Sequence, residues 1–105
     1  LEPIPFSDGF FDVISAYDLI EHIQRVVYAP NLIFPFMKLM DEICRCLWPG
    51  GQFLSFTPSL PSQVAFQNPT HVSIISESTF SNYFWEPLLW AKMYGFSGKF
   101  RLAAQ

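Results

Sequence analysis

A short apolar run at residues 10–17, FFDVISAY, predicts a β-strand because it is rich in aromatic and β-branched side chains. Phe11, Val13 and Ile14 put apolar groups on both sides of this strand, a pattern typical of parallel strands that helices cover on both faces. The polar stretch YDLIEH follows at residues 17–22. Ligands of open α/β sheets lie beyond the carboxyl ends of the strands, so we expect the chemistry of this chain at that boundary.

The strongest helical periodicity begins at Pro35, a residue type favoured at the first position of a helix. Apolar side chains fall on one helix face and charged side chains on the other. The apolar set is Phe36, Met37, Met40, Ile43, Cys44 and Leu47, and the charged set is Lys38, Asp41, Glu42 and Arg45. The sequence WPGG at residues 48–51 predicts the end of the helix, because proline interrupts the hydrogen-bond ladder and glycine allows a tight exit.

A second apolar run, QFLSFT at residues 52–57, predicts another buried strand. A strand, a helix and a strand in this order favour a right-handed crossover with the two strands parallel. Their carboxyl ends, near residues 16–17 and 57–58, should then open on the same edge of the sheet. We therefore expect one pocket to be lined by both strand ends.

Turn signals predict loops at residues 1–9 and 23–34, the second with one helical turn, and a long connection at residues 58–75. The chain of 105 residues is interpreted as a single domain. Because it opens on an apolar residue without an initiating Met, we expect it to be a piece of a longer protein.

Ser76 is a favoured cap and predicts that a helix begins after it and ends at Pro87. The side chains expected to face inward are Phe80, Tyr83 and Phe84. The aromatic stripe that these residues form with Trp85 and Trp90 indicates core or interface more than a substrate cage. Residues 88–94 predict a further short helix, and residues 95–104 predict a strand.

The composition is 50% hydrophobic, 18% aromatic and 14% charged, against roughly 25% charged residues in an ordinary soluble domain. We expect such a chain to bury apolar surface against a missing domain, a second copy or another protein. A net charge of −3 without a Lys/Arg cluster excludes nucleic acid and anionic membranes as partners. The sequence has neither an uncharged apolar run of about 18 residues nor the start of a signal peptide, so we expect a cytoplasmic protein.

Cys44 and Cys46 are two positions apart in the predicted helix and point to nearly opposite sides of it. They are poorly placed to pair with each other. We expect reduced thiols, one of them in the core.

Three separated motifs carry a family resemblance: PFSDGFFDVI at residues 5–14, LIEH at 19–22 and LWPGGQF at 47–53. In this order and spacing the chain resembles the class I S-adenosylmethionine-dependent methyltransferases that act on small molecules. The segments NPTHV at 68–72 and SESTF at 76–80 are similar to a loop and helix of that group. The resemblance implies an α/β fold: part of a Rossmann-like methyltransferase sheet, with parallel strands and flanking helices, from which the N-terminal half is absent.

The same resemblance implies cofactor contacts. The main chain at Leu1 and Glu2 would lie by the adenine of S-adenosylmethionine, and Ser15, Ala16 and Tyr17 would lie by its methionine and sulfonium portion. The family's glycine-rich cofactor loop and ribose-binding acid fall outside these residues. We therefore expect the isolated chain to bind the cofactor weakly and to be inactive.

Two histidines are candidate catalytic bases for the acceptor, His22 beyond the first strand and His71 in the long connection. Either imidazole could instead be a structural hydrogen-bonding group. The polar residues Asp18 and Glu21 could also join both histidines in a metal site, but nothing in the spacing fixes such a geometry, and we predict no metal.

Two functions follow as hypotheses. The first is methyl transfer from S-adenosylmethionine to a small-molecule acceptor. The second is a non-catalytic methyltransferase-like remnant that acts as an oligomerisation or interaction module. In either case the strand edge at residues 11–16 is an open template for pairing, so we expect a homodimer or association with the missing half through that edge.

Overall fold

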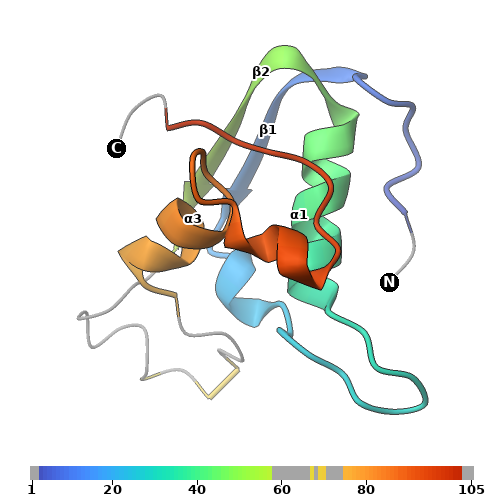
Figure 1. The fold of residues 1–105 in the computed structure, drawn as a ribbon, viewed down its shortest axis with the longest axis vertical. Helices are drawn as coiled ribbons and strands as arrows, with labels where there is room; N and C mark the ends of the chain where they lie inside the picture. The colour runs from blue at the N-terminus through green and yellow to red at the C-terminus, as the bar shows by residue number, and fades with distance from the viewer. Residues whose placement is uncertain (1–2, 58–66, 68, 71–74, 103–105) are drawn as a thin grey trace.

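Two parallel strands joined by a helix form the centre of the fold, which is a small α/β domain (Figure 1). The computed structural model describes residues 3–57, 67, 69–70 and 75–102. Within these residues the sheet consists of β1 (Phe11–Tyr17) and β2 (Leu47–Phe56), linked through the 3-10 helix η1 (Ile20–His22) and helix α1 (Pro35–Cys46). Helix α3 (Glu77–Tyr83) and the 3-10 helix η2 (Trp90–Tyr94) follow. The predicted parallel β-α-β unit is confirmed.

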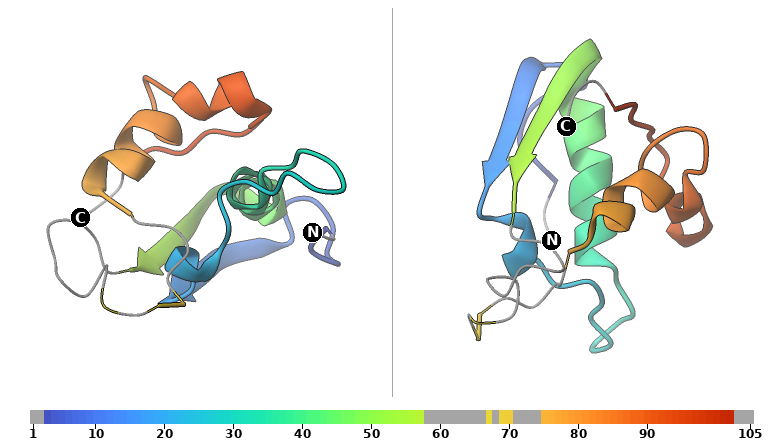
Figure 2. Two further views of the ribbon diagram at one scale, coloured as in Figure 1. Left: turned by 90° about the horizontal axis from the view of Figure 1, so that it is seen from below. Right: turned by 90° about the vertical axis from the view of Figure 1, so that its left-hand side faces the viewer.

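The helices lie on one side of the sheet, as the two views of Figure 2 show. Paired residues of parallel strands share a face, and the pairs Ile14↔Phe53 and Ala16↔Ser55 are on the side that α1 covers. The opposite face carries Val13 and the pair Tyr17↔Phe56, whose exposed fractions are 50%, 62% and 65%. The expectation that helices cover both faces is therefore wrong for the described residues, because the helices that they form lie on a single side of the sheet.

Helix α1 begins at Pro35, which occupies the first turn. The backbone N–H of the next residue, Phe36, has an acceptor in the preceding loop, because it donates to the Gln24 carbonyl at 3.0 Å. The side chains that it buries against the sheet and α3 recur at helical spacing: Phe36, Met40, Ile43 and Cys46. Both cysteines are free thiols, as expected. The buried one is Cys46, whereas Cys44, which we expected on the inner face, is half-buried.

The WPGG segment lies inside β2 and does not form a separate turn before it. The strands pair at Phe11↔Leu47 and again at Val13↔Gln52, so four residues of β2 are opposite one residue of β1. Glycine makes this bulge possible. A Cβ on Gly51 would lie 2.8 Å from the Trp48 carbonyl oxygen and 2.9 Å from that of Asp12. The helix accordingly ends at Cys46, one residue earlier than predicted.

Helix α3 begins as predicted, with a capping box in which Ser76 and Thr79 bond each other's backbone N–H groups. It ends at Tyr83, before Pro87, and places Phe84 in the core at 1% exposure. The short helix predicted at 88–94 is present as η2.

Two other segments differ from prediction. The helical turn expected within residues 23–34 lies earlier, as η1, and that loop is instead closed by an isolated antiparallel bridge, Val27↔Ile33. The strand expected at 95–104 is wrong as far as the described residues reach, because only Phe100 makes a bridge there, to Trp85. Stacking of Phe96 on Phe100, with ring centroids 6.2 Å apart, holds this segment in place of a ladder. No helix within the described residues is long and apolar enough to cross a membrane.

Candidate functional site

The carboxyl ends of β1 and β2 lie together at one edge of the sheet, as expected for parallel strands. Asp18 follows β1 with a left-handed backbone (φ 54°), a conformation that Asp tolerates better than most residues. Its N–H donates to the Phe56 carbonyl at 2.7 Å, which extends the pairing by one residue. The chain then turns into η1, and this turn brings Glu21 and His22 back over the strand ends.

Glu21 is buried, at 2% exposure, and the hydroxyl of Thr57 donates a hydrogen bond to its Oε2. Thr57 is the residue that follows β2, so this bond joins the ends of the two strands directly. Burying a carboxylate is costly unless polar partners compensate for the lost water. The site therefore places a fully enclosed acid where the two strands open.

His22 is held between Glu21 and Thr70. Its Nδ1 lies 3.1 Å from the Thr70 carbonyl oxygen and 3.2 Å from the Thr70 hydroxyl, and its Nε2 lies 3.8 Å from Glu21 Oε1. A carbonyl oxygen only accepts, so a hydrogen bond to it puts the ring proton on Nδ1. In that tautomer Nε2 keeps its lone pair, and a proton taken up there would face the Glu21 carboxylate. The arrangement sets Nε2 of His22 beside a buried carboxylate.

The predicted cofactor residues of β1 divide between the two faces of the sheet. Ser15 and Tyr17 are exposed on the open face. Ala16 is 5% exposed and belongs to the hydrophobic core, so its side chain is unavailable to any ligand and only its backbone remains for that role. Leu1, Glu2 and His71 lie outside the described residues.

Sequence reasoning missed part of this site. The sequence places Glu21 in the polar stretch after the first strand and Thr57 at the end of the second, but the one role it suggests for Glu21 is that of a metal ligand, and it suggests no role for the Thr57 or Thr70 side chain. Thr57 had a usable signal, a hydroxyl residue directly after an apolar strand. The contact of Thr70 with His22 spans 48 positions, and no local pattern predicts it. Among the described residues, no three His, Cys, Asp or Glu side chains gather closely enough to hold a metal ion.

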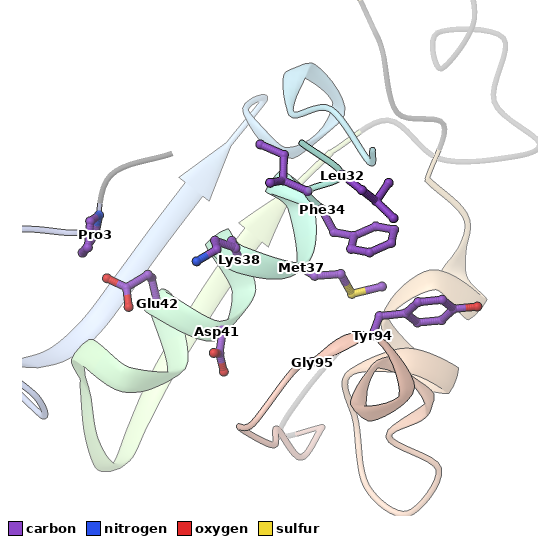
Figure 3. Close-up of a pocket in the computed structure, with 10 residues that line it drawn as sticks. Pro3, Leu32, Phe34, Met37, Lys38, Asp41, Glu42, Tyr94 and Gly95 are labelled. Carbon is purple, nitrogen blue, oxygen red and sulfur yellow. The ribbon is translucent and has the colours of Figure 1, made fainter. Parts of the chain in front are cut away.

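Two cavities lie along α1 and away from the strand ends. One, of about 330 Å³, is lined by the α1 residues Lys38, Asp41 and Glu42 and by Tyr94 (Figure 3). The other, of about 310 Å³, lies beside it between the first turn of α1 and α3. Phe34, Met37 and Tyr94 line both cavities. Neither cavity is lined by both strand ends, as the predicted pocket would be.

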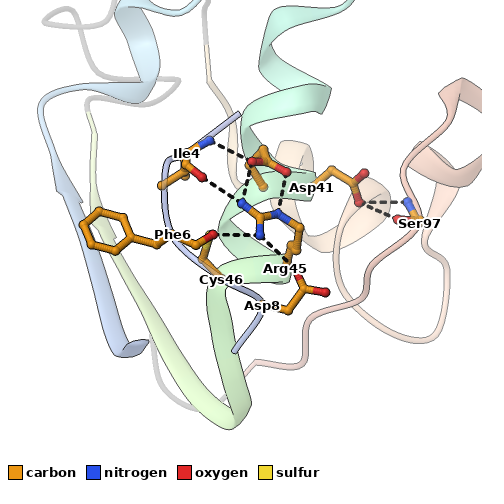
Figure 4. A network of polar contacts seen from close by, with 8 residues as sticks. Ile4, Phe6, Asp8, Asp41, Arg45, Cys46 and Ser97 are labelled. Carbon is orange, nitrogen blue, oxygen red and sulfur yellow. Dashed lines mark hydrogen bonds and ion pairs between the residues drawn. The ribbon is translucent and has the colours of Figure 1, made fainter. Parts of the chain in front are cut away.

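A second polar cluster lies at the amino ends of the strands, around Arg45 (Figure 4). Its guanidinium donates two hydrogen bonds to Glu42, at 2.8 and 2.9 Å, and one to Asp8 at 2.8 Å. It also donates to the carbonyl oxygens of Ile4 and Phe6, both at 2.9 Å. Hydrogen bonding from Arg45 lowers the pKa of the Glu42 carboxyl below its ordinary value. This cluster fastens the segment before β1 to the end of α1, which is a structural role.

Comparison with known proteins gives no relative. No protein-family model matches the chain, and no curated protein or solved structure is significantly similar to it.

Proposed function

We propose that this chain is part of a class I S-adenosylmethionine-dependent methyltransferase and that the complete enzyme methylates a small-molecule acceptor. The observation that carries the proposal is the Glu21–Thr57 hydrogen bond across the ends of two parallel strands. It joins the LIEH motif to the end of β2, the strand that begins with LWPGG, and these are two of the three motifs on which the resemblance rests. In this proposal the chain supplies the second half of a Rossmann-like sheet.

The residues present fit one end of the cofactor. When bound, S-adenosylmethionine supplies an electrophilic methyl group on a sulfonium. The exposed Ser15 hydroxyl and Tyr17 ring, with the exposed Asp18 carboxylate beyond them, offer polar and anionic groups suited to the charged methionine and sulfonium portion. The glycine-rich loop and the ribose-binding acid have no counterpart among the described residues, so the proposal requires that a further segment provide them.

His22 is the proposed general base. Methyl transfer to a hydroxyl or a protonated amine needs alignment of the acceptor and removal of one proton. His22 Nε2 would take that proton, Thr70 would hold the ring through Nδ1, and the Glu21 carboxylate would balance the charge on the imidazolium.

The test uses the reading frame that encodes these residues, extended upstream as far as it stays open. The extended protein should transfer labelled methyl from S-adenosylmethionine to a small-molecule acceptor. His22→Gln should lower kcat by about 10²- to 10⁴-fold and leave cofactor binding intact, because a general base contributes about that much. Gln24→Ala, a change of an exposed side chain two residues away, is the matched control.

The proposal fails if the extended protein neither contains a glycine-rich strand-to-helix turn nor binds S-adenosylmethionine. Full activity of His22→Gln would remove the assigned base and leave the fold assignment standing. Calorimetry on the 105-residue chain alone should show no micromolar binding of the cofactor.

The open face of the sheet favours a second candidate function, an interaction module without catalysis. Val13, Tyr17 and Phe56 expose apolar groups on that face, and the outer edge of β1 has no partner strand among the described residues. In this case we propose self-association through the β1 edge. Light scattering that shows a monomer at high concentration would contradict it.

A further inference from the structure

The apolar cavity beside the first turn of α1 has the features of a small-molecule site. Its volume is about 310 Å³, at the lower end of the roughly 300–1,000 Å³ that is usual for ligand pockets. It lies between the loop that follows η1, the start of α1, helix α3 and Tyr94. Ser15, Tyr17 and His22 do not line it, so it is distinct from the strand-end site.

The loop on one side of this cavity is ordered by its own backbone hydrogen bonds, before any ligand binds. The Gln24 carbonyl accepts the Phe36 N–H, and Val27 and Ile33 exchange two backbone hydrogen bonds of 2.9 and 2.8 Å. These three bonds fix the backbone on both sides of Arg25 and Val26, the two loop residues that line the cavity. A ligand would therefore meet a loop whose backbone is already ordered, which reduces the entropy lost on binding.

Aromatic rings form most of the remaining wall, together with Met37 and Thr79. Phe36 and Phe84 are buried, at 5% and 1% exposure, and their rings stack with centroids 5.8 Å apart and planes at 26°. Tyr94 packs against Phe34 at 5.7 Å, and Tyr83 completes the wall from α3. Ring faces and edges arranged in this way favour another planar ring over a flexible chain.

The charges of the two neighbouring cavities differ. Lys38, Asp41 and Glu42 line the larger one, so it presents both signs. Among the described residues that line the smaller cavity, Arg25 is the one that carries a full charge at neutral pH, and it is exposed at the surface. A guanidinium beside an aromatic cavity complements an anion attached to an aromatic ring.

We propose that this cavity binds a planar aromatic carboxylate, with its ring among Phe36, Phe84 and Tyr94 and its carboxylate on Arg25. The proposal stands on the cavity and does not depend on the methyltransferase assignment.

The experiment measures binding of 2-naphthoate to the whole protein by calorimetry and by chemical-shift changes. Wild type should bind one equivalent saturably and should bind the neutral analogue 2-naphthylmethanol about tenfold more weakly, the scale of one charge-assisted hydrogen bond. Arg25→Gln should weaken naphthoate about tenfold and leave naphthylmethanol unchanged. Lys38→Gln, in the neighbouring cavity, is the matched control and should change neither.

Val26→Trp tests the cavity itself, since the larger side chain should fill it and abolish binding of both compounds. Thermal unfolding of each variant establishes that it is folded, and Arg25→Met, which also removes the charge, replaces Arg25→Gln if the latter unfolds. Absence of saturable binding to wild type, or equal affinity for the two compounds, overturns the proposal. A loss caused by Lys38→Gln and not by Arg25→Gln overturns it as well, because it would put the anion in the other cavity.

Discussion

The two ends of the β1–β2 sheet each carry an acid, half-buried Glu42 at one end and buried Glu21 at the other, and the two acids have different partners. At the amino end, Glu42 is bonded by Arg45, a group that stays charged at any pH a protein meets. At the carboxyl end, Glu21 faces the Thr57 hydroxyl and the His22 ring, which can gain or lose a proton. The comparison teaches that a fixed ion pair fastens the chain at one end, whereas at the other end a carboxylate lies beside an imidazole, the pair to which we assign proton transfer in the proposed enzyme.

The largest effect is expected at the amino end. Arg45→Met should lower the free energy of unfolding more than any of the changes that follow, because it removes five hydrogen bonds and leaves the Glu42 carboxylate without this cation. Urea unfolding followed by tryptophan fluorescence measures the loss. The control Lys38→Met, an exposed cation on the same helix, should change stability by less than about 0.5 kcal/mol. Equal losses of stability in the two variants would show that Arg45 does not fasten the segment before β1 to α1.

The next largest loss of stability is expected at the bulge of β2, at the same end of the sheet. Gly51→Ala should destabilise the protein by about 2 kcal/mol, because the new Cβ would press on two backbone oxygens, at 2.8 and 2.9 Å. Gly50→Ala meets no atom within 4 Å but has φ +91°, so strain alone should cost about 1 kcal/mol. The same unfolding measurement compares the two. A harmless Gly51→Ala would show that the bulge adjusts, and the amino end would then be less rigid than the comparison requires.

A smaller change in stability is expected when the Glu21 carboxylate, at the carboxyl end, is replaced by an amide. Glu21→Gln keeps an oxygen acceptor for Thr57 and nearly the same shape, so unfolding should become easier by no more than about 1 kcal/mol. Glu21→Ala is the matched variant and should cost about 2–3 kcal/mol, since it leaves the Thr57 hydroxyl without this acceptor and empties a buried volume. If Glu21→Gln destabilises the fold as strongly as Arg45→Met, Glu21 is an anchor too and the contrast between the two ends is lost.

The smallest effect is a pH dependence of folding stability that the Glu42 carboxyl causes. Its pKa is lower in the folded chain than the ordinary 4.5, chiefly through the hydrogen bonds from Arg45. A lowered pKa gives stability that is complete above the unfolded value and is lost as pH falls through the folded value. The gap in stability between wild type and Glu42→Gln should therefore shrink below pH 4.5. A gap that stays constant down to about pH 3 would contradict this linkage.

The sequence predicted the fold correctly where a local pattern of residues was compatible with a single structure. The period of Phe36, Met40 and Ile43 determines the inner face of α1, and the crossover rule then requires parallel strands. Ser76, a favoured cap, correctly predicted where α3 begins.

Other features depend on tertiary context that no local pattern contains. Val13 has the same β-branched character whether a second layer of helices covers it or not, so the open face was missed. The segment at 96–100 alternates like a strand, but its phenylalanines pack into the core and on each other. At the candidate site His22 was predicted from its place after β1, whereas Thr70 reaches it from a distant loop. The aromatic cavity is assembled from four separate segments and has no signature in any of them.

The one-sided sheet has a consequence for how the molecule opens. Two strands without further support are marginal in water, so β1 and β2 depend on the docking of α1 for their stability. Opening of that contact would release both strand termini together, as one cooperative unit. Arg45, at the amino end of the sheet, therefore helps to keep the residues around His22 in place at the carboxyl end, although the two side chains are not in contact.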